Sequence, residues 1–398
     1  MISLSTASLF MLALMAAGPL LLRHNNKYRA YILLFINLLV YVLGASSPLQ
    51  LLIAALWVLL PYVLLRTIGR SFNKGLLIIP MVVIFAYLMK YDTIFELLHI
   101  PYAFAFKLLG LSYFLFREID FIMQYDYLKE EGVRISLPDY LNYVLSFYTL
   151  LAGPILRYEE FVQVFYETVT PFEKGELLRL VNRIVNGYVK VYIISSLLGY
   201  WAGIWFDGLN NHSGIISTAA AFVVFAYLNG WFIYFNFSGY CDIVNGFAHL
   251  AHLPVHENFN QPYLARSVTE FWNRHHITLS EWIRDYIYSP FFKWLISGPC
   301  GNNIKLGNYI ALFFTFTVAG IWHGTDANYL VYGLFQGLGI VVATWWKDHR
   351  KKWLGKERNK AYEKSLVFIT IGRCVTWMYI CLTFSFVGYD VVGWMLQR

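Results

Sequence analysis

Charged residues are scarce in this sequence of 398 residues. Only 14% of the chain is Asp, Glu, Lys or Arg, whereas soluble domains carry roughly 25%. No polar stretch is long enough to bury a core of its own, so a separate soluble domain is not expected. Hydrophobic residues make up 58% of the chain and the mean hydropathy is +0.50. The composition therefore predicts an integral membrane protein.

The apolar runs lack the alternation of every second residue that marks a membrane β-barrel. Several are instead continuous and approach the ~20 residues that a helix needs to cross a bilayer. The sequence thus predicts an all-α polytopic membrane protein. The expected spans are 4–22, 28–43, 51–65, 76–89, 140–156, 185–206, 215–235, 309–321, 330–346 and 366–387. Two shorter runs, 103–116 and 243–253, could be half-spans, and the polar stretches 118–138 and 171–183 are expected to be loops or interfacial segments.

Metal-binding cysteine patterns are also missing. The four cysteines, Cys241, Cys300, Cys374 and Cys381, have no C-x-x-C spacing, so they predict neither a zinc site nor a redox compartment. No basic groove with interleaved aromatic residues suggests nucleic acid. The net charge of +7 instead suggests loops that face the cytoplasm and anionic lipid.

The first apolar run has no basic residues before it, so it is predicted to be a retained span and not a signal peptide. Lys and Arg cluster at 23–29, 66–74 and 347–364. If these loops are cytoplasmic, the N-terminus is external. The block 347–364 is a topology determinant on this interpretation, and acidic lipid headgroups are an alternative ligand for it.

A lone histidine, His323, follows the apolar run that ends at Trp322 and lies between Gly320 and Gly324. Ionisable residues within a membrane are costly and indicate function. A neutral imidazole with a pKa near ~6.5 could act as general base on a hydroxyl. A structural hydrogen bond between helices is the alternative. The next span carries Gly333 and Gly337, a spacing that predicts close helix packing.

A second cluster follows Trp272 and contains Arg274, His275 and His276. On a continuous helix, His276, Ser280 and Arg284 would share one face, and Asp285 follows directly. The cluster predicts an interfacial helix, with or without chemistry. Adjacent histidines diverge on a helix and no third ligand has the right spacing, so no metal site is predicted.

Two further stretches combine apolar and polar residues. The first ends in Asn236, Ser238, Tyr240 and Asp242, which could line a polar tunnel or cap a helix at the water boundary. No G-x-S-x-G motif surrounds Ser238, so it is not predicted to be a nucleophile. The second, 151–158, contains Gly-Pro and predicts a kink or exit.

Several of these strings together resemble the membrane-bound O-acyltransferase (MBOAT) family, in its bacterial branch of alginate O-acetyltransferases and D-alanyl-lipoteichoic-acid transfer proteins. The matching strings are LAGPILRY (151–158), FSGYCD (237–242), ENFNQPY (257–263), EFWNRHHITLS (270–280), WIRDYIY (282–288) and GIWHG (320–324), with Tyr332-Gly333 after them. GLSYF (110–114) resembles an earlier element of the family. The likeness covers most of the chain in the family's order.

This resemblance implies a single transmembrane domain over 1–398, built as a ring of tilted helices around a central tunnel. Residues 1–100 would be N-terminal spans, 140–346 the catalytic core and 366–398 the last span. His323 would be the essential intramembrane histidine and His276 the family's second histidine. Three positions depart from the family's pattern: His275 replaces a usual Trp, Asn236 an Asp, and Gln336 a histidine found in some members.

The resemblance further implies a protein of the bacterial cytoplasmic membrane that transfers an acyl group, most simply acetyl, to a hydroxyl of an extracytoplasmic polysaccharide or cell-envelope polymer. No bound cofactor is expected. The donor would be a thioester, acetyl-CoA or an acyl carrier protein, and an extracytoplasmic partner would complete transfer. Trp322 and Asn328 are candidate oxyanion donors, and His276 and Arg284 candidates for orienting substrate.

Two other classes of protein fit the same architecture. A transporter or flippase would also place a histidine within the membrane, although no internal repeat favours it. A scaffold without catalysis would recruit a soluble partner, for example through the block 347–364. Transfer of D-alanyl to teichoic acid is the alternative within the family.

Overall fold

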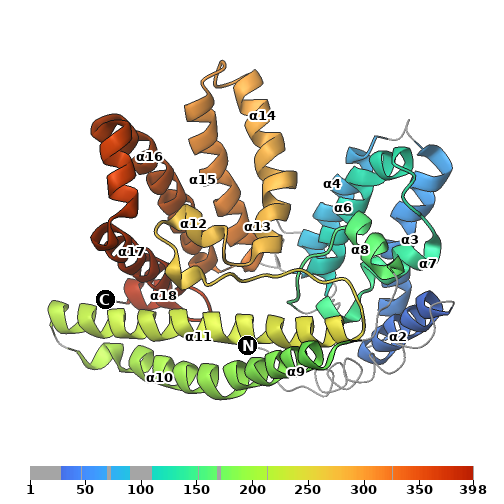
Figure 1. The fold of residues 1–398 in the computed structure, drawn as a ribbon, viewed down its shortest axis with the longest axis horizontal. Coiled ribbons are helices and arrows are strands. Elements are labelled where there is room, and N and C mark those ends of the chain that lie inside the picture. The colour runs from blue at the N-terminus through green and yellow to red at the C-terminus, as the bar shows by residue number, and fades with distance from the viewer. Residues whose placement is uncertain are drawn as a thin grey trace. The chain divides into compact units, whose positions relative to one another are not determined.

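The computed structural model describes residues 28–45, 47–69, 73–89, 110–150, 152–167, 172–212, 214–324 and 326–397. Within these ranges the regular elements are helices, and an isolated β-bridge joins Phe259 to His275 (Figure 1). The expected span 4–22, the N-terminus and residues 103–109 of the run 103–116 lie outside the described residues. The chain forms two compact units: Met1–Tyr188 with Gly239–His256, and Val189–Ser238 with Glu257–Arg398.

The first unit gathers helices around a core of buried aromatic rings. Its helices are α2 (Arg29–Gly44), α3 (Pro48–Ile68), α4 (Gly75–Met89), α6 (Leu111–Glu130), α7 (Leu137–Val144), α8 (Tyr158–Tyr166), α9 (Lys174–Tyr188) and the end of α11 (Ile215–Leu250). The spans predicted at 28–43, 51–65 and 76–89 are helical, but α2 and α4, with 16 and 15 residues, are shorter than the candidate membrane spans. In the core, the ring of Phe121 lies 4.6 Å from that of Tyr140 and 4.9 Å from that of Tyr158.

The predicted loop or interfacial segment 118–138 begins instead with the second half of helix α6. Two of its charged residues, Glu118 and Asp120, are buried inside the unit. The Asp120 carboxylate accepts hydrogen bonds from the Tyr143 hydroxyl at 2.8 Å and the Tyr158 amide at 3.0 Å, and it pairs with Arg157 at 2.9 Å. Because these partners are distant in sequence, the mixed charge of the segment was misleading.

The predicted span 140–156 is also wrong. Helix α7 ends at Val144, a 3-10 turn covers Phe147–Thr149, and residues 152–157 are not helical. Pro154 disfavours helix at the residue before it. A Cβ atom on Gly153 would lie 2.6 Å from the Thr149 Cα atom, so the chain folds back too closely for any other residue.

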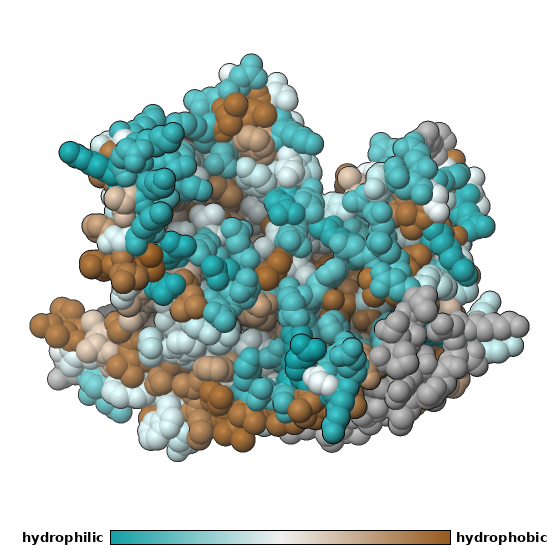
Figure 2. Space-filling view, in the orientation of Figure 1, coloured by the Kyte–Doolittle hydropathy of each residue, from teal (hydrophilic) through white to brown (hydrophobic). Residues whose placement is uncertain are grey.

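The second unit contains most of the long helices. Its elements are a π-helix (Val189–Ser195), α10 (Ser196–Asp207), the first part of α11, α12 (Val268–Trp272), α13 (Ile277–Ile283), a π-helix (Arg284–Tyr288), α14 (Ser289–Ser297), α15 (Ile304–His323), α16 (Ala327–Lys364), α17 (Leu366–Phe384) and α18 (Val391–Leu396). Figure 2 shows apolar surface along α10, where Leu197, Trp201 and Ile204 are exposed.

Six helical segments of the described residues are long and apolar enough to cross a membrane. They are Pro48–Ile68, Lys174–Asn211, Ile215–Leu250, Ile304–His323, Ala327–Lys364 and Leu366–Phe384. Their positions agree with the spans predicted at 51–65, 185–206, 215–235, 309–321, 330–346 and 366–387. The chain is an all-α polytopic membrane protein.

Helices α15 and α16 form a tightly packed hairpin. A Cβ atom on Gly320 would lie 2.4 Å from the Gly333 Cα atom, and one on Gly337 would lie 2.8 Å from the Phe313 carbonyl oxygen. The predicted close packing of these glycines is therefore confirmed. At the turn between the helices, a Cβ atom on Gly324 would lie 2.1 Å from the Tyr329 ring, so glycine is needed directly after His323.

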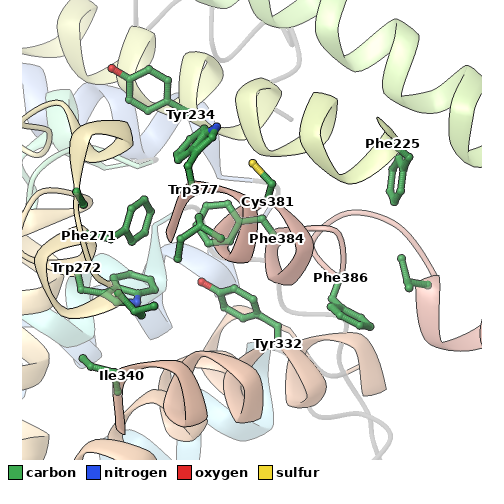
Figure 3. Close-up of a cluster of buried hydrophobic side chains, with 14 of the residues drawn as sticks. Phe225, Tyr234, Phe271, Trp272, Tyr332, Ile340, Trp377, Cys381, Phe384 and Phe386 are labelled. Atoms are coloured by element: carbon green, nitrogen blue, oxygen red, sulfur yellow. The ribbon is translucent and has the colours of Figure 1, made fainter. Parts of the chain in front are cut away.

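Aromatic residues from three helices form the core beside this hairpin. Figure 3 shows Phe271 and Trp272 of α12 gathered with Tyr332 of α16 and Phe384 of α17. The Tyr332 and Phe384 rings lie 5.8 Å apart, and Phe271 and Phe384 lie 6.0 Å apart. This cluster holds the short helix α12 against the hairpin. It thereby also holds the start of the turn that carries His275 and His276, which we call the histidine turn.

Candidate functional site

The two adjacent histidines lie on a tight turn between α12 and α13 and not on a helix. Helix α12 ends at Trp272, and α13 begins at Ile277. His276 has a φ of 47°, in the left-handed region that few non-glycine residues adopt. The predicted single helix through His276, Ser280 and Arg284 is therefore wrong, although Ser280 and Arg284 do line one cavity.

A strand-like segment after His256 holds this turn. The Asn260 amide donates to the Arg274 carbonyl oxygen at 2.9 Å, and the Ile277 amide donates to the Asn258 carbonyl oxygen at 3.1 Å. The Asn258 side-chain oxygen accepts from the Thr278 amide at 3.2 Å and from its hydroxyl at 2.7 Å. The string ENFNQPY thus fixes the backbone of the histidine turn. The left-handed backbone of His276 costs on the order of 1–3 kcal/mol of folding free energy.

His275 lies in a cage of aromatic rings. Its imidazole stacks on Phe271 at 4.7 Å and meets Phe259 at 5.1 Å, Phe384 at 5.5 Å and Trp272 at 5.7 Å. His275 lies outside the candidate spans, and burial, then the charge of His323, lowers the pKa of His275 to about 3. The imidazole is therefore neutral near pH 7.

His276 is buried next to Phe237, with the two rings 4.7 Å apart. Burial, followed by the charges of His275 and His323, lowers the pKa of His276 well below its usual value. The Nδ1 atoms of His275 and His276 have no hydrogen-bond partner among the described residues. Both side chains are buried, and neither is among the residues that line the cavity beside His323.

His323 is the last residue of α15 and is half-buried. Its imidazole lies 4.6 Å from the Trp322 ring and 5.8 Å from the Tyr332 ring. The Tyr332 ring lies 5.8 Å from the Phe384 ring, which in turn lies 5.5 Å from the His275 imidazole. One aromatic cluster of the second unit therefore links His323 to the turn that carries His275 and His276.

His323 lines a cavity of about 580 Å³ in the second unit. Helix α15 contributes one face of residues spaced four apart, namely Thr315, Ala319 and His323. Further lining comes from Trp272, Ile277, Ser280, Arg284, Phe316, Tyr332, Gln336 and Ile340. An apolar cavity with few convergent polar groups is typical of a small-molecule site.

Trp272 is fixed on the cavity wall by a chain of hydrogen bonds. Its Nε1 donates to the Gln336 side-chain oxygen at 3.1 Å, and the Gln336 amide nitrogen donates to the Thr383 hydroxyl at 2.6 Å. Gln336 is fully buried. It therefore joins α12, α16 and α17 by polar contacts that an apolar residue could not supply.

The predicted basic residues have local partners. Arg274 pairs with Glu270 at 2.9 Å and also donates to the Asn260 carbonyl oxygen at 3.2 Å. Arg284 pairs with its neighbour Asp285 at 3.1 Å. Arg284 lines the cavity, whereas Arg274 braces the histidine turn.

The residues predicted on α11 divide between the two units. Asn236 and Ser238 belong to the second unit: the Asn236 amide donates to the Ser195 hydroxyl at 3.3 Å, and the Ser238 hydroxyl is buried without a partner among the described residues. Tyr240 and Asp242 belong to the first unit, where Asp242 pairs with Arg183 at 3.0 Å.

Of the two predicted oxyanion donors, Trp322 adjoins His323, whereas Asn328 is occupied elsewhere. The Asn328 amide donates to the Asp390 carboxylate at 2.9 Å and its oxygen accepts from the Val392 amide at 2.9 Å. These bonds fasten the C-terminal segment to the start of α16.

Thr315 lines the cavity but was not predicted from the sequence. The hydroxyls of Thr317 and Thr344 donate to helix carbonyl oxygens at 2.9 and 2.7 Å. The buried Thr315 hydroxyl has no such partner among the described residues, so it is available to a bound molecule. The spacing of Thr315, Ala319 and His323 on one helix face was the signal that could have found it. Among the described residues, no group of three His, Cys, Asp or Glu side chains could hold a metal ion.

The sequence profile of the membrane-bound O-acyltransferase family matches residues 61–388. The chain belongs to this family. The match includes both histidine strings and every residue of the cavity. The resemblance inferred from the sequence motifs is confirmed.

Among its relatives, the chain is 33% identical over 237 residues to a probable alginate O-acetylase AlgI of Pseudomonas aeruginosa, covering 59% of this chain and 42% of the relative. It is 28% identical over 284 residues to a teichoic acid D-alanyltransferase of Bacillus subtilis, covering 71% of this chain and 67% of the relative. A teichoic acid D-alanyltransferase of Streptococcus thermophilus is 28% identical over 268 residues, covering 65% and 61%. The matches thus span about 42–67% of the length of these relatives.

Proposed function

We propose that the protein is a multi-pass O-acyltransferase of the bacterial cytoplasmic membrane. It transfers an acyl group, most simply acetyl, from a cytoplasmic thioester to a hydroxyl of an extracytoplasmic polysaccharide or cell-envelope polymer. The observation that carries the proposal is the position of His323 on the wall of an apolar cavity of about 580 Å³. Relatives named as an alginate O-acetylase and as teichoic acid D-alanyltransferases support the class of acceptor.

In the proposed reaction, the neutral imidazole of His323 takes the proton of the acceptor hydroxyl, or of a hydroxyl on a partner protein. The oxygen attacks the thioester carbonyl carbon, and a tetrahedral oxyanion forms. The intermediate collapses with cleavage of the carbon–sulfur bond, and the imidazolium returns the proton to the departing thiolate. General base catalysis of this kind contributes roughly 10²–10⁴-fold.

His276 is assigned a supporting role. Burial lowers its pKa well below the usual value, so it stays neutral and can donate or accept one hydrogen bond without adding charge to the site. Arg284, on the cavity wall, would orient the donor or acceptor. Acetyl-CoA or an acyl carrier protein would supply the acyl group, and an extracytoplasmic partner would complete its transfer.

The test is acyl transfer by cells that carry His323→Ala. We expect transfer to fall by at least about 100-fold, because general base catalysis contributes roughly 10²–10⁴-fold and His323 is the histidine among the residues that line the cavity. Mass spectrometry of cell-envelope glycans, with and without the protein, measures the ester. Membrane levels are measured in parallel.

His212→Ala is the matched control, because it removes a histidine from the loop after α10, away from the cavity-lining residues. Undiminished transfer by His323→Ala at normal membrane levels would rule out the mechanism. Uptake of a labelled substrate into proteoliposomes without covalent acylation would instead favour a transporter.

Transfer of D-alanyl is the alternative within the family, because D-alanyltransferases cover more of this chain than the alginate O-acetylases do. The same mass spectra distinguish the two, since the ester that disappears identifies the acyl group. Loss of an amino-acyl ester, with acetyl esters unchanged, would replace acetyl by D-alanyl as the transferred group.

A further inference from the structure

A second cavity of about 370 Å³ lies in the same unit, between the end of α12, the charged part of α16 and the start of α17. We call it the basic cavity. Its charged lining residues are Arg266, Lys347 and Arg350 together with Glu270 and Glu363. Thr269 and Asn273 line both this cavity and the one that contains His323.

Both acidic side chains of the basic cavity are already paired. Glu270 pairs with Arg274 at 2.9 Å and with Arg266 at 3.5 Å, and Glu363 pairs with Arg350 at 2.6 Å. Lys347 forms no ion pair or hydrogen bond with the described residues. The cavity therefore has an unshared positive charge at its wall.

The guanidinium of Arg350 is held in place by three contacts, and one of its nitrogen atoms remains available to a ligand. Its Nε donates to Asn359 at 2.8 Å, its Nη2 to Glu363 at 2.6 Å, and its guanidinium lies 4.5 Å from the centre of the Tyr362 ring. The Nη1 atom has no partner among the described residues. A guanidinium fixed in this way loses little entropy when it binds an anion.

The charge of the surrounding segment also favours binding of an anion. The segment 347–364 contains eight Lys or Arg and three Asp or Glu, a net of five positive charges. Helix α16 breaks within this segment at Gly355, whose φ is +68°. Aromatic side chains of Trp346, Tyr362 and Phe368 form the apolar part of the lining.

We propose that the basic cavity binds a phosphate group, with Lys347 and the free edge of Arg350 as its ligands. Lys and Arg beside each other are the typical phosphate ligands of proteins. Either an anionic phospholipid headgroup or a soluble phosphate ester could supply the group. This inference does not depend on acyl transfer, because it concerns binding alone.

The test uses the full-length protein in nanodiscs and two probes. The first probe is phosphatidylglycerol added to phosphatidylcholine nanodiscs, with the thermal midpoint as readout. The second is coenzyme A titrated into phosphatidylcholine nanodiscs. We expect Lys347→Ala to weaken binding of one probe about tenfold, the loss of one charge-assisted hydrogen bond, and Lys347→Arg to restore it.

Lys352→Ala is the matched control, because it removes an exposed lysine of the same helix outside the cavity. A response confined to phosphatidylglycerol identifies the lipid as the source, and one confined to coenzyme A identifies a soluble ester. Equal effects of Lys347→Ala and Lys352→Ala on both probes would overturn the proposal. His323→Ala should bind both probes as the wild type does, which separates this site from the proposed reaction.

Discussion

At the scale of single residues, three neighbouring histidines have different surroundings. His275 is enclosed by aromatic rings, His276 is buried on a strained turn, and His323 lies on a cavity wall. Enclosure keeps His275 uncharged and rigid, which suits a positioning residue. Only His323 combines a helix terminus with access to the volume in which substrate could bind. The difference in surroundings therefore supports the proposal that His323, and not its neighbours, is the base.

The low pKa of His275, about 3, predicts that acid destabilises the protein. Between pH 6.5 and that value, the unfolded chain binds a proton at this position and the folded chain does not. Stability should therefore fall on acidification by about 1.4 kcal/mol per pH unit for each such group. His275→Phe, which suits the aromatic cage, should reduce this fall, as measured by thermal unfolding in detergent from pH 6.5 to 4.5.

The matched control for that experiment is His349→Phe, an exchange of the same type on the charged part of α16. His276 contributes in the same direction as His275, so a residual fall is expected in His275→Phe. An acid slope identical to that of the wild type would contradict the buried, neutral state of His275.

At the scale of elements, the long helices could be predicted and the site's turn could not. Apolar runs near 215–235 and 366–387 predicted α11 and α17 because lipid exposure and helix length act locally. The turn at His276 depends on Asn258, which is 18 positions earlier and whose side chain holds Thr278. Ser280 and Arg284 do have a helical spacing, but the helix that carries Ser280 begins only at Ile277, after the turn.

Asn258→Ala is predicted to displace the histidine turn and to lower acyl transfer by about 100-fold, because small misplacements of catalytic groups have effects of this size. Asn260→Ala is the matched control, since Asn260 holds the turn through its backbone and its side chain is exposed. Both variants are compared at equal membrane levels. Equal transfer by the two would show that the Asn258 side chain does not position the turn.

At the scale of the whole molecule, the composition predicted the membrane-spanning architecture, while tertiary pairing determined the exceptions. The Asp120 carboxylate of α6 is satisfied by Tyr143, Tyr158 and Arg157, and the sequence of α6 itself reveals none of these partners. The run 140–156 is apolar, yet helix α7 ends at Val144 and Gly153 lies close against Thr149. Hydropathy alone measures neither of these contacts.

The positive charge of 347–364 predicts that this end of α16 faces the cytoplasm. Lys356→Cys, in a background with Cys300→Ser and Cys374→Ser, should react with a membrane-impermeant maleimide only in inverted vesicles. The same background without Lys356→Cys shows the residual labelling. Labelling in intact cells would reverse the predicted orientation of α16 and α17.

The π-helical turn Arg284–Tyr288 contains one more residue per turn than an α-helix would, and each α-helical residue rotates the chain by about 100°. Deleting one residue there would restore α-helical geometry and change which side chains of the turn face the cavity, because five π-helical and four α-helical residues turn through about the same angle. The length of this stretch therefore sets how Arg284 and Tyr288 meet the cavity wall. Over evolutionary time, insertions and deletions should accumulate in the loop 298–303 before they appear within 284–288, and gap positions across many relatives would check this.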